Sequence, residues 1–251
     1  MDKINRFIEY LKESENIVFF GGAGVSTESG IPDFRSKDGL YNQHDVRFEE
    51  YNPEYLLSND CLFRKPAVFY EFYRQKMDTR GIAPNITHTV LAKLEKAGKV
   101  KAVVTQNIDG LHQLAGSRNV YELHGTTLRN YCAGCKEVYP FDYIFKSDER
   151  IPRCTKCNGQ IRPYVTLYGE QLPGDAVEGA VRCIEEADML IIGGTSLTVY
   201  PAAGFIRYFG GKHIVVINRD EIKVNLDEEK DIMIFDSLGN VFSQVEKALG
   251  L

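Results

Sequence analysis

The chain has 251 residues, 43% of them hydrophobic, enough to bury a sizeable core in one large domain or two small ones. Its formal net charge of −5 argues against a protein that holds nucleic acid by bulk charge. It contains no apolar run of about eighteen residues, so we expect no membrane span, and its charged amphipathic start is not a secretory signal.

The predicted elements alternate between helices and short apolar strands. Helical spacing comes first, at Ile4, Phe7, Ile8 and Leu11. Short apolar runs then occupy residues 17–20, 102–105, 120–123, 189–192, 214–217 and 232–235. Helical patterns over residues 87–97 and 176–187 separate several of them. This alternation predicts an α/β fold, a Rossmann-like parallel sheet with helices on both faces.

A glycine-rich loop follows the first predicted strand, in FFGGAGVSTESGIPDFR at residues 19–35. Gly22 and Gly24 permit a tight turn and a close backbone approach to a pyrophosphate, assisted by the dipole of a following helix. Thr27 stands where a dinucleotide fingerprint has its third glycine, and the strand-end acidic residue expected about 20 positions later is missing. Alone, the loop is equally well explained as a simple turn.

Polar side chains follow three later strands. Thr195 and Ser196 come after residues 189–192, and Asn218 ends the next strand; the first two are alternatively caps of the next helix. TQNIDGLH, at residues 105–112, places three polar side chains together, namely Gln106, Asn107 and Asp109. Burying all three without partners is costly, so a hydroxyl-rich ligand with an amide ring would suit them, although an Asx turn explains one of them.

His124 follows residues 120–123 and precedes Gly125. A histidine at a strand end is well placed as a general base, because its unperturbed pKa lies near neutrality, although a lone histidine also serves structural roles. We interpret the other histidines as surface or packing residues, namely His44, His88, His112 and His213.

Four of the six cysteines form two C-x-x-C pairs, Cys132 with Cys135 and Cys154 with Cys157. Four thiolates at this spacing can close a tetrahedron around zinc with bonds of about 2.3 Å, and such a site has no open position. We therefore expect one structural zinc per chain; a redox dithiol is the weaker alternative. Cys61 and Cys183 are interpreted as ordinary semi-buried cysteines.

Two insertions interrupt the α/β pattern. Residues 37–83 hold no convincing strand and include a helical pattern over residues 66–77, while residues 126–162 carry the cysteine pairs and are otherwise rich in turns. We predict a discontinuous Rossmann-like domain and a small domain made of a helical insertion and a zinc-ribbon module. The Rossmann-like domain covers residues 1–36, 84–125 and 163–251; the helical insertion covers 37–83 and the zinc-binding module 126–162.

Seven motifs together identify a family. In chain order they are GAGVSTESGIPDFR (22–35), TQNIDGLHQLAGS (105–117), ELHG (122–125), the two C-x-x-C pairs, RPYVTLYGE (162–170), GTSL (194–197) and VIN (216–218). With them, the chain resembles the sirtuins, NAD-dependent protein lysine deacetylases of the bacterial type, over nearly its whole length.

The resemblance implies that NAD is consumed as a substrate. The acyl-lysine carbonyl oxygen would attack the anomeric carbon of NAD, releasing nicotinamide and finally free lysine and O-acetyl-ADP-ribose. His124 would deprotonate a ribose hydroxyl, Asn107 would orient the ribose and a water, and Ile108 and Asp109 would receive the nicotinamide amide. The implied catalytic residues are His124, Asn107 and Asp109.

The resemblance also implies the remaining contacts of NAD and of the acetylated peptide. Phe34 would cover the reacting sugar, Gln106 would touch the ribose, and Asn240 would lie near the adenine. Ala23, Thr27 and Arg35 would hold the pyrophosphate side. Thr195, Ser196 and Asn218 would anchor the adenosine. Val165, Tyr168 and the strand-like VTLYGE would line the acyl-lysine tunnel and pair with the substrate backbone.

The acyl preference depends on FYEFYRQKM at residues 69–77. Sirtuins that remove acidic acyl groups carry Tyr-x-x-Arg there; here Tyr70 is followed by Tyr73 at the arginine position, and Arg74 comes one residue later. Positions i and i+4 share a helix face, so Arg74 could still reach the site, but we favour deacetylation. The alternatives are mono-ADP-ribosyl transfer, removal of longer or acidic acyl groups, and a nucleotide-sensing zinc module without turnover. As partners we expect acetylated proteins, no nucleic acid and no membrane, for a monomer in the cytoplasm.

Overall fold

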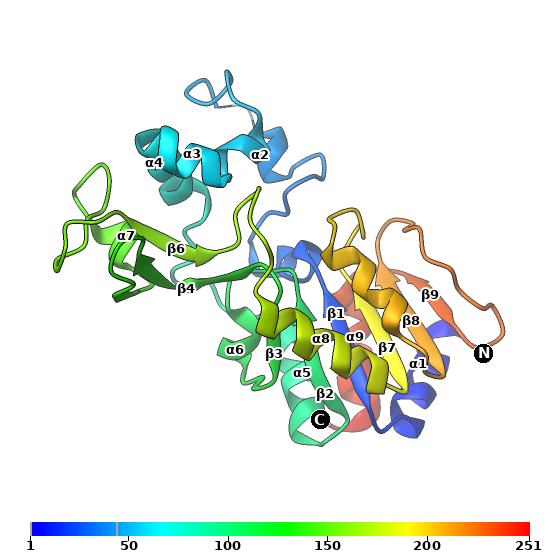
Figure 1. Ribbon diagram of the computed structural model, residues 1–251. Coiled ribbons are helices and arrows are strands. Elements are labelled where there is room, and N and C mark those ends of the chain that lie inside the picture. The colour runs from blue at the N-terminus through cyan, green and yellow to red at the C-terminus, as the bar shows by residue number, and fades with distance from the viewer. Residues whose placement is uncertain (1, 44) are drawn as a thin grey trace.

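The computed structural model describes residues 2–43 and 45–251, so the interpretation of His44 lies outside the described residues. The chain forms two lobes, a larger one built on a parallel sheet and a smaller one of helices and a short sheet (Figure 1). The six strands of the large sheet are arranged in the order β3-β2-β1-β7-β8-β9, and every neighbouring pair is parallel. These strands are β1 (Ile17–Gly21), β2 (Val100–Thr105), β3 (Val120–Glu122), β7 (Met189–Gly193), β8 (His213–Asn218) and β9 (Ile232–Phe235).

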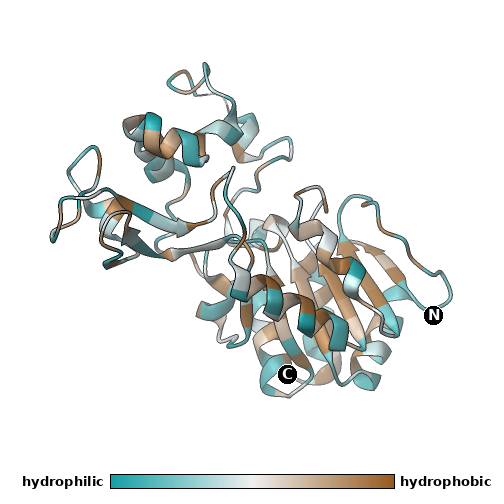
Figure 2. Cartoon of the chain, in the orientation of Figure 1, coloured by the Kyte–Doolittle hydropathy of each residue, from teal (hydrophilic) through white to brown (hydrophobic). Residues whose placement is uncertain are grey.

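All six predicted strands and the predicted parallel sheet are confirmed. The central strands are brown in Figure 2 because nearly every residue in them is apolar and buried from both sides. Successive residues alternate between two cores. Phe19, Val103 and Ile191 face one core, whereas Phe20, Val104 and Ile192 face the other.

Helices cover both faces of the large sheet. One core includes residues of α1 (Lys3–Glu13), α5 (Ile86–Lys96) and α9 (Leu238–Leu249). The other includes residues of α8 (Gly174–Glu186) and of the 3₁₀ helix η4 (Ala202–Tyr208). The helical patterns over 87–97 and 176–187 are thus confirmed, each beginning one or two residues earlier than expected.

The strand order reverses beside β1. From β1 the chain continues outward to β2 and β3, then returns to the other side of β1 as β7. In a parallel sheet the loops that leave the carboxyl ends at such a switch point diverge and leave a crevice for a ligand. Here those ends are Gly21 and Gly193, which are paired in register.

The smaller lobe combines the two insertions. Its helices are α2 (Pro53–Leu56), α3 (Asn59–Arg64), α4 (Pro66–Lys76) and α7 (Tyr143–Lys146). They pack on an antiparallel sheet of order β5-β4-β6, comprising β4 (Gly125–Cys132), β5 (Val138–Pro140) and β6 (Ile161–Val165). Residues 126–162 are rich in turns, as expected, but most of β4 also lies there; it was not predicted because half of its residues are polar and it shows no apolar run.

The remaining elements are short: α6 (Leu111–Ala115) and the 3₁₀ helices η1 (Ala23–Val25), η2 (Thr27–Ser29) and η3 (Leu40–Asn42). Of the remaining cysteines, Cys61 is fully buried and Cys183 partly buried. Among the helices of residues 2–43 and 45–251, none has both the length and the apolar character that a bilayer span requires.

Candidate active site

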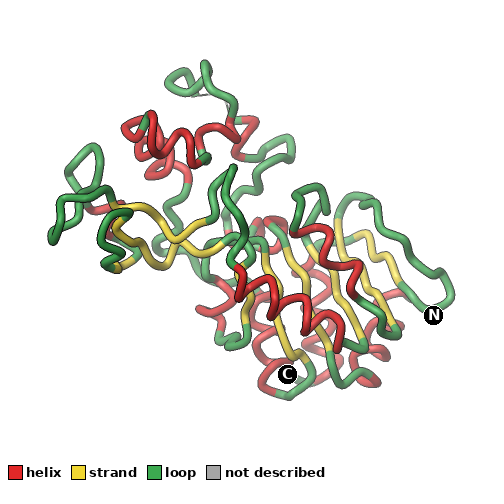
Figure 3. The backbone as a smooth tube through the Cα atoms, in the orientation of Figure 1, coloured by secondary structure: helices red, strands yellow, loops and turns green. Residues whose placement is uncertain are grey.

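A cleft of about 1480 Å³ runs past the carboxyl edge of the large sheet and reaches the smaller lobe. Most of its walls are loops, which Figure 3 shows in green between the lobes. Its volume exceeds the range of about 300–1,000 Å³ that is common for small-ligand pockets, so the cleft has room for a dinucleotide and a peptide side chain. The sequence-predicted residues that line it are Ala23, Thr27, Phe34, Arg35, Gln106, Asn107, Ile108, His124, Val165, Tyr168, Thr195, Ser196 and Asn218.

Two glycine loops meet at the switch point. The N–H of Gly24 donates to the carbonyl oxygen of Gly194 at 2.8 Å. A Cβ on Gly24 would lie 2.8 Å from the Gly194 backbone, and one on Gly194 would lie 2.5 Å from the Val25 nitrogen. Both positions therefore require glycine for the contact between the loops themselves, before any ligand is considered.

Two local expectations for these loops are wrong. The first glycine loop is followed by two short 3₁₀ turns, η1 and η2, and not by an α-helix. Only a weak helix dipole could therefore act on a pyrophosphate here. Thr195 and Ser196 do not cap a helix, since η4 begins at Ala202. Instead the Thr195 hydroxyl accepts from the Leu197 N–H at 3.2 Å within a turn.

Ser26 links Asn107 to Asp109. The Ser26 hydroxyl donates to Asp109 Oδ2 at 2.7 Å and accepts from Asn107 Nδ2 at 3.0 Å. Asp109 is buried, and this desolvation raises the pKa of its carboxyl group. Asn107 lines the cleft, whereas in the described structure Asp109 does not. Sequence reasoning missed Ser26; its only signal was a hydroxyl inside the glycine loop.

His124 is fixed in one orientation beside the cleft. Its Nδ1 lies 2.9 Å from the Gln106 carbonyl oxygen, which can only accept, so Nδ1 carries the hydrogen. Nε2 is then left as an acceptor. Desolvation lowers the pKa of His124, with the nearby Arg35 also lowering it, so the ring is neutral at pH 7. A neutral imidazole with an unprotonated nitrogen can act as a general base.

The position after His124 must be glycine for a steric reason. Gly125 has φ of +71°, and a Cβ there would lie 2.2 Å from the Tyr164 carbonyl oxygen. Strand β6 therefore runs directly against the backbone that carries the base, and the Thr166 N–H donates to the His124 carbonyl at 2.9 Å.

Arg35 and Tyr168 meet across the cleft. An Arg35 guanidinium nitrogen lies 3.1 Å from the Tyr168 hydroxyl, and this hydroxyl is 2.9 Å from that of Tyr41. The Phe34 ring packs edge-on against Tyr41, with centroids 5.5 Å apart. The sequence did not indicate Tyr41, because its contact is with Tyr168, which lies 127 positions later in the chain.

The adenosine-side candidates are distributed along three strand ends. Gln106 Nε2 donates to the Thr195 hydroxyl at 3.2 Å, and this joins the loop after β2 to the loop after β7. Asn218 Nδ2 donates to the Asp220 carbonyl at 2.8 Å. Asn240 lies in the first turn of α9 and bonds Asp236; nearby it is Ser237 and Leu238 that line the cleft.

The strand-like character expected for VTLYGE holds only at Val165, where β6 ends. Beyond it the chain makes a single isolated bridge, between Tyr168 and Ser58. Glu170 accounts for this irregular path, because it accepts from both terminal nitrogens of Arg162 at 2.6 and 2.8 Å and from the Leu167 N–H. A partly buried bidentate pair of this kind fixes the path of a loop without the hydrogen bonds of a strand pairing.

The four predicted metal ligands come together in the smaller lobe. The sulfur atoms of Cys132, Cys135, Cys154 and Cys157 all lie within 4.8 Å of one another. Two of the separations are 3.4 Å and 3.6 Å, close to the edge of about 3.8 Å that a tetrahedron with Zn–S bonds of about 2.3 Å requires. A hydrogen bond from Tyr139 lowers the pKa of Cys154 to about 6, which favours the ligating thiolate. The cluster therefore fits one zinc ion.

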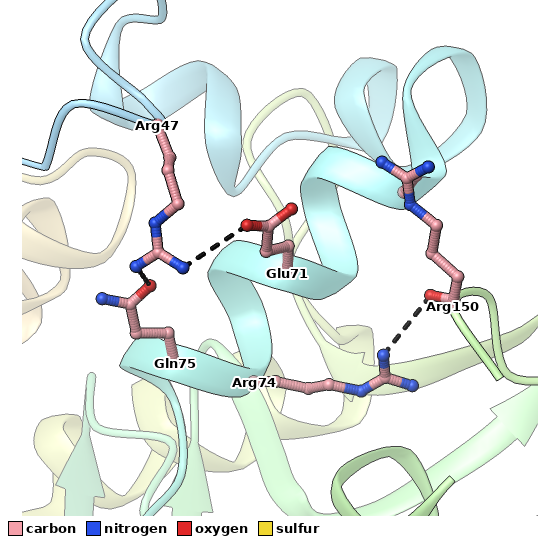
Figure 4. Close-up of a pocket in the computed structure, with 6 residues that line it drawn as sticks. Arg47, Glu71, Arg74, Gln75 and Arg150 are labelled. Carbon is pink, nitrogen blue, oxygen red and sulfur yellow. Dashed lines mark hydrogen bonds and ion pairs between the residues drawn. The ribbon is translucent and has the colours of Figure 1, made fainter. Parts of the chain in front are cut away.

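Hydrogen bonds show which of the three α4 side chains Tyr70, Tyr73 and Arg74 is free to meet an acyl group. Arg74 donates to the backbone carbonyls of Ile144, Arg150 and Glu149, and Figure 4 shows it extending from α4 toward Arg150. Tyr70 donates to the Ile161 carbonyl. Only Tyr73 of the three lines the cleft. The expectation that Arg74 could reach the acyl group is therefore wrong for this structure.

Comparison with known proteins gives concordant results. The model of the Sir2 family matches residues 22–201. The chain is 52% identical over 245 residues to an NAD-dependent protein deacetylase of Clostridium acetobutylicum, covering 98% of both chains. It is also 52% identical over 246 residues to the same kind of protein from Clostridium perfringens, covering 97% of this chain and 98% of that one.

Solved structures agree with these relatives. The chain is similar to a structure described as "Sir2-p53 peptide-NAD+", with 37% identity, a TM-score of 0.84 and 99% of both chains covered. It is also similar to one described as "Sir2 bound to acetylated peptide", with 35% identity, a TM-score of 0.85 and 99% coverage of both. With a parallel sheet, a cysteine tetrad and a cleft at the switch point in addition, this chain belongs to the Sir2 family.

Proposed function

We propose that this chain is an NAD-dependent protein lysine deacetylase. It transfers the acetyl group of N6-acetyl-lysine to ADP-ribose and releases nicotinamide, O-acetyl-ADP-ribose and the unmodified lysine. One observation carries the proposal: His124 presents an unprotonated Nε2 beside a cleft that is lined by the glycine loops and Asn107, in a chain of the Sir2 family. Structures described as holding NAD and acetylated peptides support the same reaction.

The NAD site extends along the carboxyl edge of the sheet in this proposal. Thr195, Ser196 and Asn218 bind the adenosine half, and Asn240 lies near the adenine. Ala23, Thr27 and Arg35 bind the pyrophosphate side, with Arg35 supplying the positive charge. Gln106 contacts the ribose, and Ile108 and Asp109 bind the nicotinamide amide. In the described structure Asp109 is buried behind the residues that line the cleft, with its carboxyl group accepting from the Ser26 hydroxyl.

Bound NAD would supply an anomeric carbon that the acetyl-lysine carbonyl oxygen can attack, with nicotinamide leaving as the glycosidic bond breaks. In this step Asn107 orients the ribose and a water, and Phe34 shields the reacting carbon from solvent. His124 then takes a proton from a ribose hydroxyl at Nε2, and the Gln106 carbonyl stabilises the resulting imidazolium through Nδ1–H. Because burial lowers the pKa of His124, the base is unprotonated at neutral pH when this step begins.

The acetyl-lysine enters between the lobes, with Val165 and Tyr168 lining its path. We assign residues 1–36, 84–125 and 163–251 to the NAD-binding domain, 37–83 to the helical insertion and 126–162 to the zinc-binding module. Strands β4 and β6 cross these borders, since β4 begins at Gly125 and β6 ends at Val165, so the sheet of the module reaches the cleft. We also propose a monomer in the cytoplasm, which size-exclusion chromatography with light scattering and cell fractionation would test.

Mass spectrometry tests the reaction directly. An acetylated peptide incubated with NAD and the zinc-loaded protein should lose its acetyl group while nicotinamide and O-acetyl-ADP-ribose accumulate in equal amounts. A peptide that gains ADP-ribose instead would replace the proposal with mono-ADP-ribosyl transfer. An unchanged peptide without nicotinamide release would refute turnover altogether.

A further inference from the structure

Glu28 places a carboxylate at the far end of the cleft from the base. It lies in η2, directly after the glycine loop, and its side chain lines the cleft and is 23% exposed, so a ligand in the cleft can reach it. Its Oε2 accepts from the Gly239 N–H, in the first turn of α9, at 2.8 Å. Its Oε1 lies 3.7 Å from a guanidinium nitrogen of Arg219. The carboxylate is therefore held in place from two sides.

The segments that meet at this carboxylate are those assigned to the adenosine. Arg219 directly follows Asn218, which ends β8 and binds the adenosine half in the proposed function. Ser237 is the N-cap of α9, and all three residues line the cleft together with Glu28. The ribose of the adenosine would thus lie close to Glu28, with hydroxyl groups that can donate to a carboxylate.

Without Glu28, this end of the cleft would suit a phosphate group. Free N–H groups at a helix N-terminus and a guanidinium are both good partners for an anion. Glu28 occupies the Gly239 N–H and balances the charge of Arg219. A Cβ on Gly239 would overlap the Glu28 carboxylate, so the contact between them is tight. A phosphate added to the ribose 2′-hydroxyl would therefore meet a fixed negative charge.

Other charges near this end of the cleft act in the same direction. Further charged side chains line it, namely Asp220, Glu221, Lys223 and Asp236. Carboxylates therefore outnumber cations among the described residues at this end. Glu28 differs from the other carboxylates because it faces both Arg219 and the first turn of α9, the two groups that would otherwise bind a phosphate.

The sequence lacks the acidic residue that dinucleotide-binding folds carry about 20 positions after the glycine loop, where it binds the ribose hydroxyl of NAD. We propose that Glu28 supplies this discrimination from a different position, as a specificity-determining residue that admits NAD and excludes the 2′-phosphate of NADP. This inference rests on the proposed NAD-dependent function and specifies its co-substrate. Glu28 acts through its charge and takes no part in acetyl transfer.

Deacetylation of one acetylated peptide with NAD or with NADP tests the inference. The wild type should have the higher kcat/KM with NAD. Glu28→Gln keeps an acceptor for the Gly239 N–H but removes the charge. The NADP-to-NAD ratio of kcat/KM should therefore rise about 10-fold, the effect of one unit charge on a phosphate group in a largely solvated cleft. Adding Arg219→Ala to this variant should reverse the rise, because the freed guanidinium would bind the phosphate.

Glu246→Gln is the matched control. Glu246 also lies on α9, is paired with Lys93 at 2.7 Å and has a similar side-chain exposure of 29%, but in the described structure it does not line the cleft. The variant removes the same charge from the molecule, so it should leave the ratio unchanged. Isothermal titration with NAD and with NADP makes the same comparison without turnover.

The possible results separate clearly. A wild type that uses NADP as well as NAD, or a ratio unchanged in Glu28→Gln, would overturn the inference. An equal loss with both co-substrates would show that Glu28 only holds the glycine loop in place, which also overturns it. If Glu28→Gln does not fold, the wild-type ratio and the binding ratio of Glu28→Ala decide. A wild type that is inactive with NAD itself would instead refute the proposed function, so the two failures are distinguishable.

Discussion

At the scale of single residues, the site depends on side chains whose orientation is fixed by backbone carbonyls. His124 is the main case, because the Gln106 carbonyl sets its tautomer and leaves Nε2 toward the reaction. His213 has the same kind of bond, from Nδ1 to the Lys230 carbonyl, but its ring stacks on Tyr10, with centroids 3.7 Å apart, far along the chain from the catalytic motifs. The two histidines thus share a local geometry and differ only in where the fold places them.

Replacing His124 should therefore separate chemistry from binding. His124→Ala should lower the deacetylation rate by about 10²- to 10⁴-fold, the usual contribution of a general base, while NAD still binds. Nicotinamide release and isothermal titration with NAD measure the two effects, and His213→Ala is the matched control with near-normal values for both. An active His124→Ala protein, or one that has lost NAD binding, would contradict the assignment.

The pH dependence follows from the same residue. His124 must be unprotonated to accept a proton, and burial lowers its pKa below the ordinary value of about 6.5. The acid limb of the rate should thus have its midpoint below about pH 6.5. A profile of kcat/KM against pH checks this, with circular dichroism at each pH to confirm that the protein stays folded. An acid limb centred above pH 7 would show that a different group is the base.

At the scale of elements, α5 and α6 meet through two buried histidines. His88 and His112 pack with ring centroids 4.7 Å apart, and both are almost fully buried. His88 also completes the capping box of α5, its Nδ1 accepting from the Asn85 N–H at 3.2 Å. Desolvation lowers the pKa of His88 to about 4 and that of His112 to about 3. The packing role expected for these residues is confirmed.

This pair predicts acid sensitivity. The unfolded chain binds protons at these sites below pH 6.5 whereas the folded chain does not until about pH 4, so stability is lost as the pH falls through this window. For His88 alone, the free energy of unfolding should drop by about 2 kcal/mol between pH 7 and pH 5. His88→Gln keeps a capping-box residue that does not titrate. Urea unfolding of this variant should therefore show a fall in the free energy of unfolding, between pH 7 and pH 5, that is smaller than in the wild type by about 2 kcal/mol. An equal drop in both proteins would mean that His88 is not the titrating group.

The elements also show how far sequence patterns reach. The strands of the large sheet were predictable because each is an apolar run, and the cysteine tetrad because its spacing suits a single ion. Strand β4 was not, since its sequence GTTLRNYC shows no apolar run and is held as a strand by pairing with β5 and β6, which come later in the chain. Ser26 and Tyr41 were missed for the same reason: their roles arise from contacts with Asp109 and Tyr168, which only the folded chain brings near.

At the scale of the whole molecule, the two lobes are different kinds of structure joined at the cleft. The larger lobe has two apolar cores of its own. The core of the smaller lobe includes Cys132 and Cys154 themselves, so part of its packing depends on the cysteine cluster. Strand β4 runs from Gly125, next to the base, to Cys132 in the cysteine cluster. Loss of the metal should therefore disturb the geometry of the active site, although zinc takes no part in the reaction.

Zinc removal should unfold the lobes unequally. After chelation, amide exchange should accelerate over residues 126–165 and in α4, because bound metal contributes directly to the folding free energy of such modules. Exchange in β1, β2 and β7 should stay slow, since their packing lies in the other cores. Deacetylation activity should be lost together with this protection and should return when zinc is added back. The Cys132→Ser variant should not regain activity on addition of zinc. Cys183→Ser, outside the cluster, is the control and should behave as wild type. A zinc-free protein with normal exchange and full activity would show that the four cysteines are not what holds the smaller lobe together.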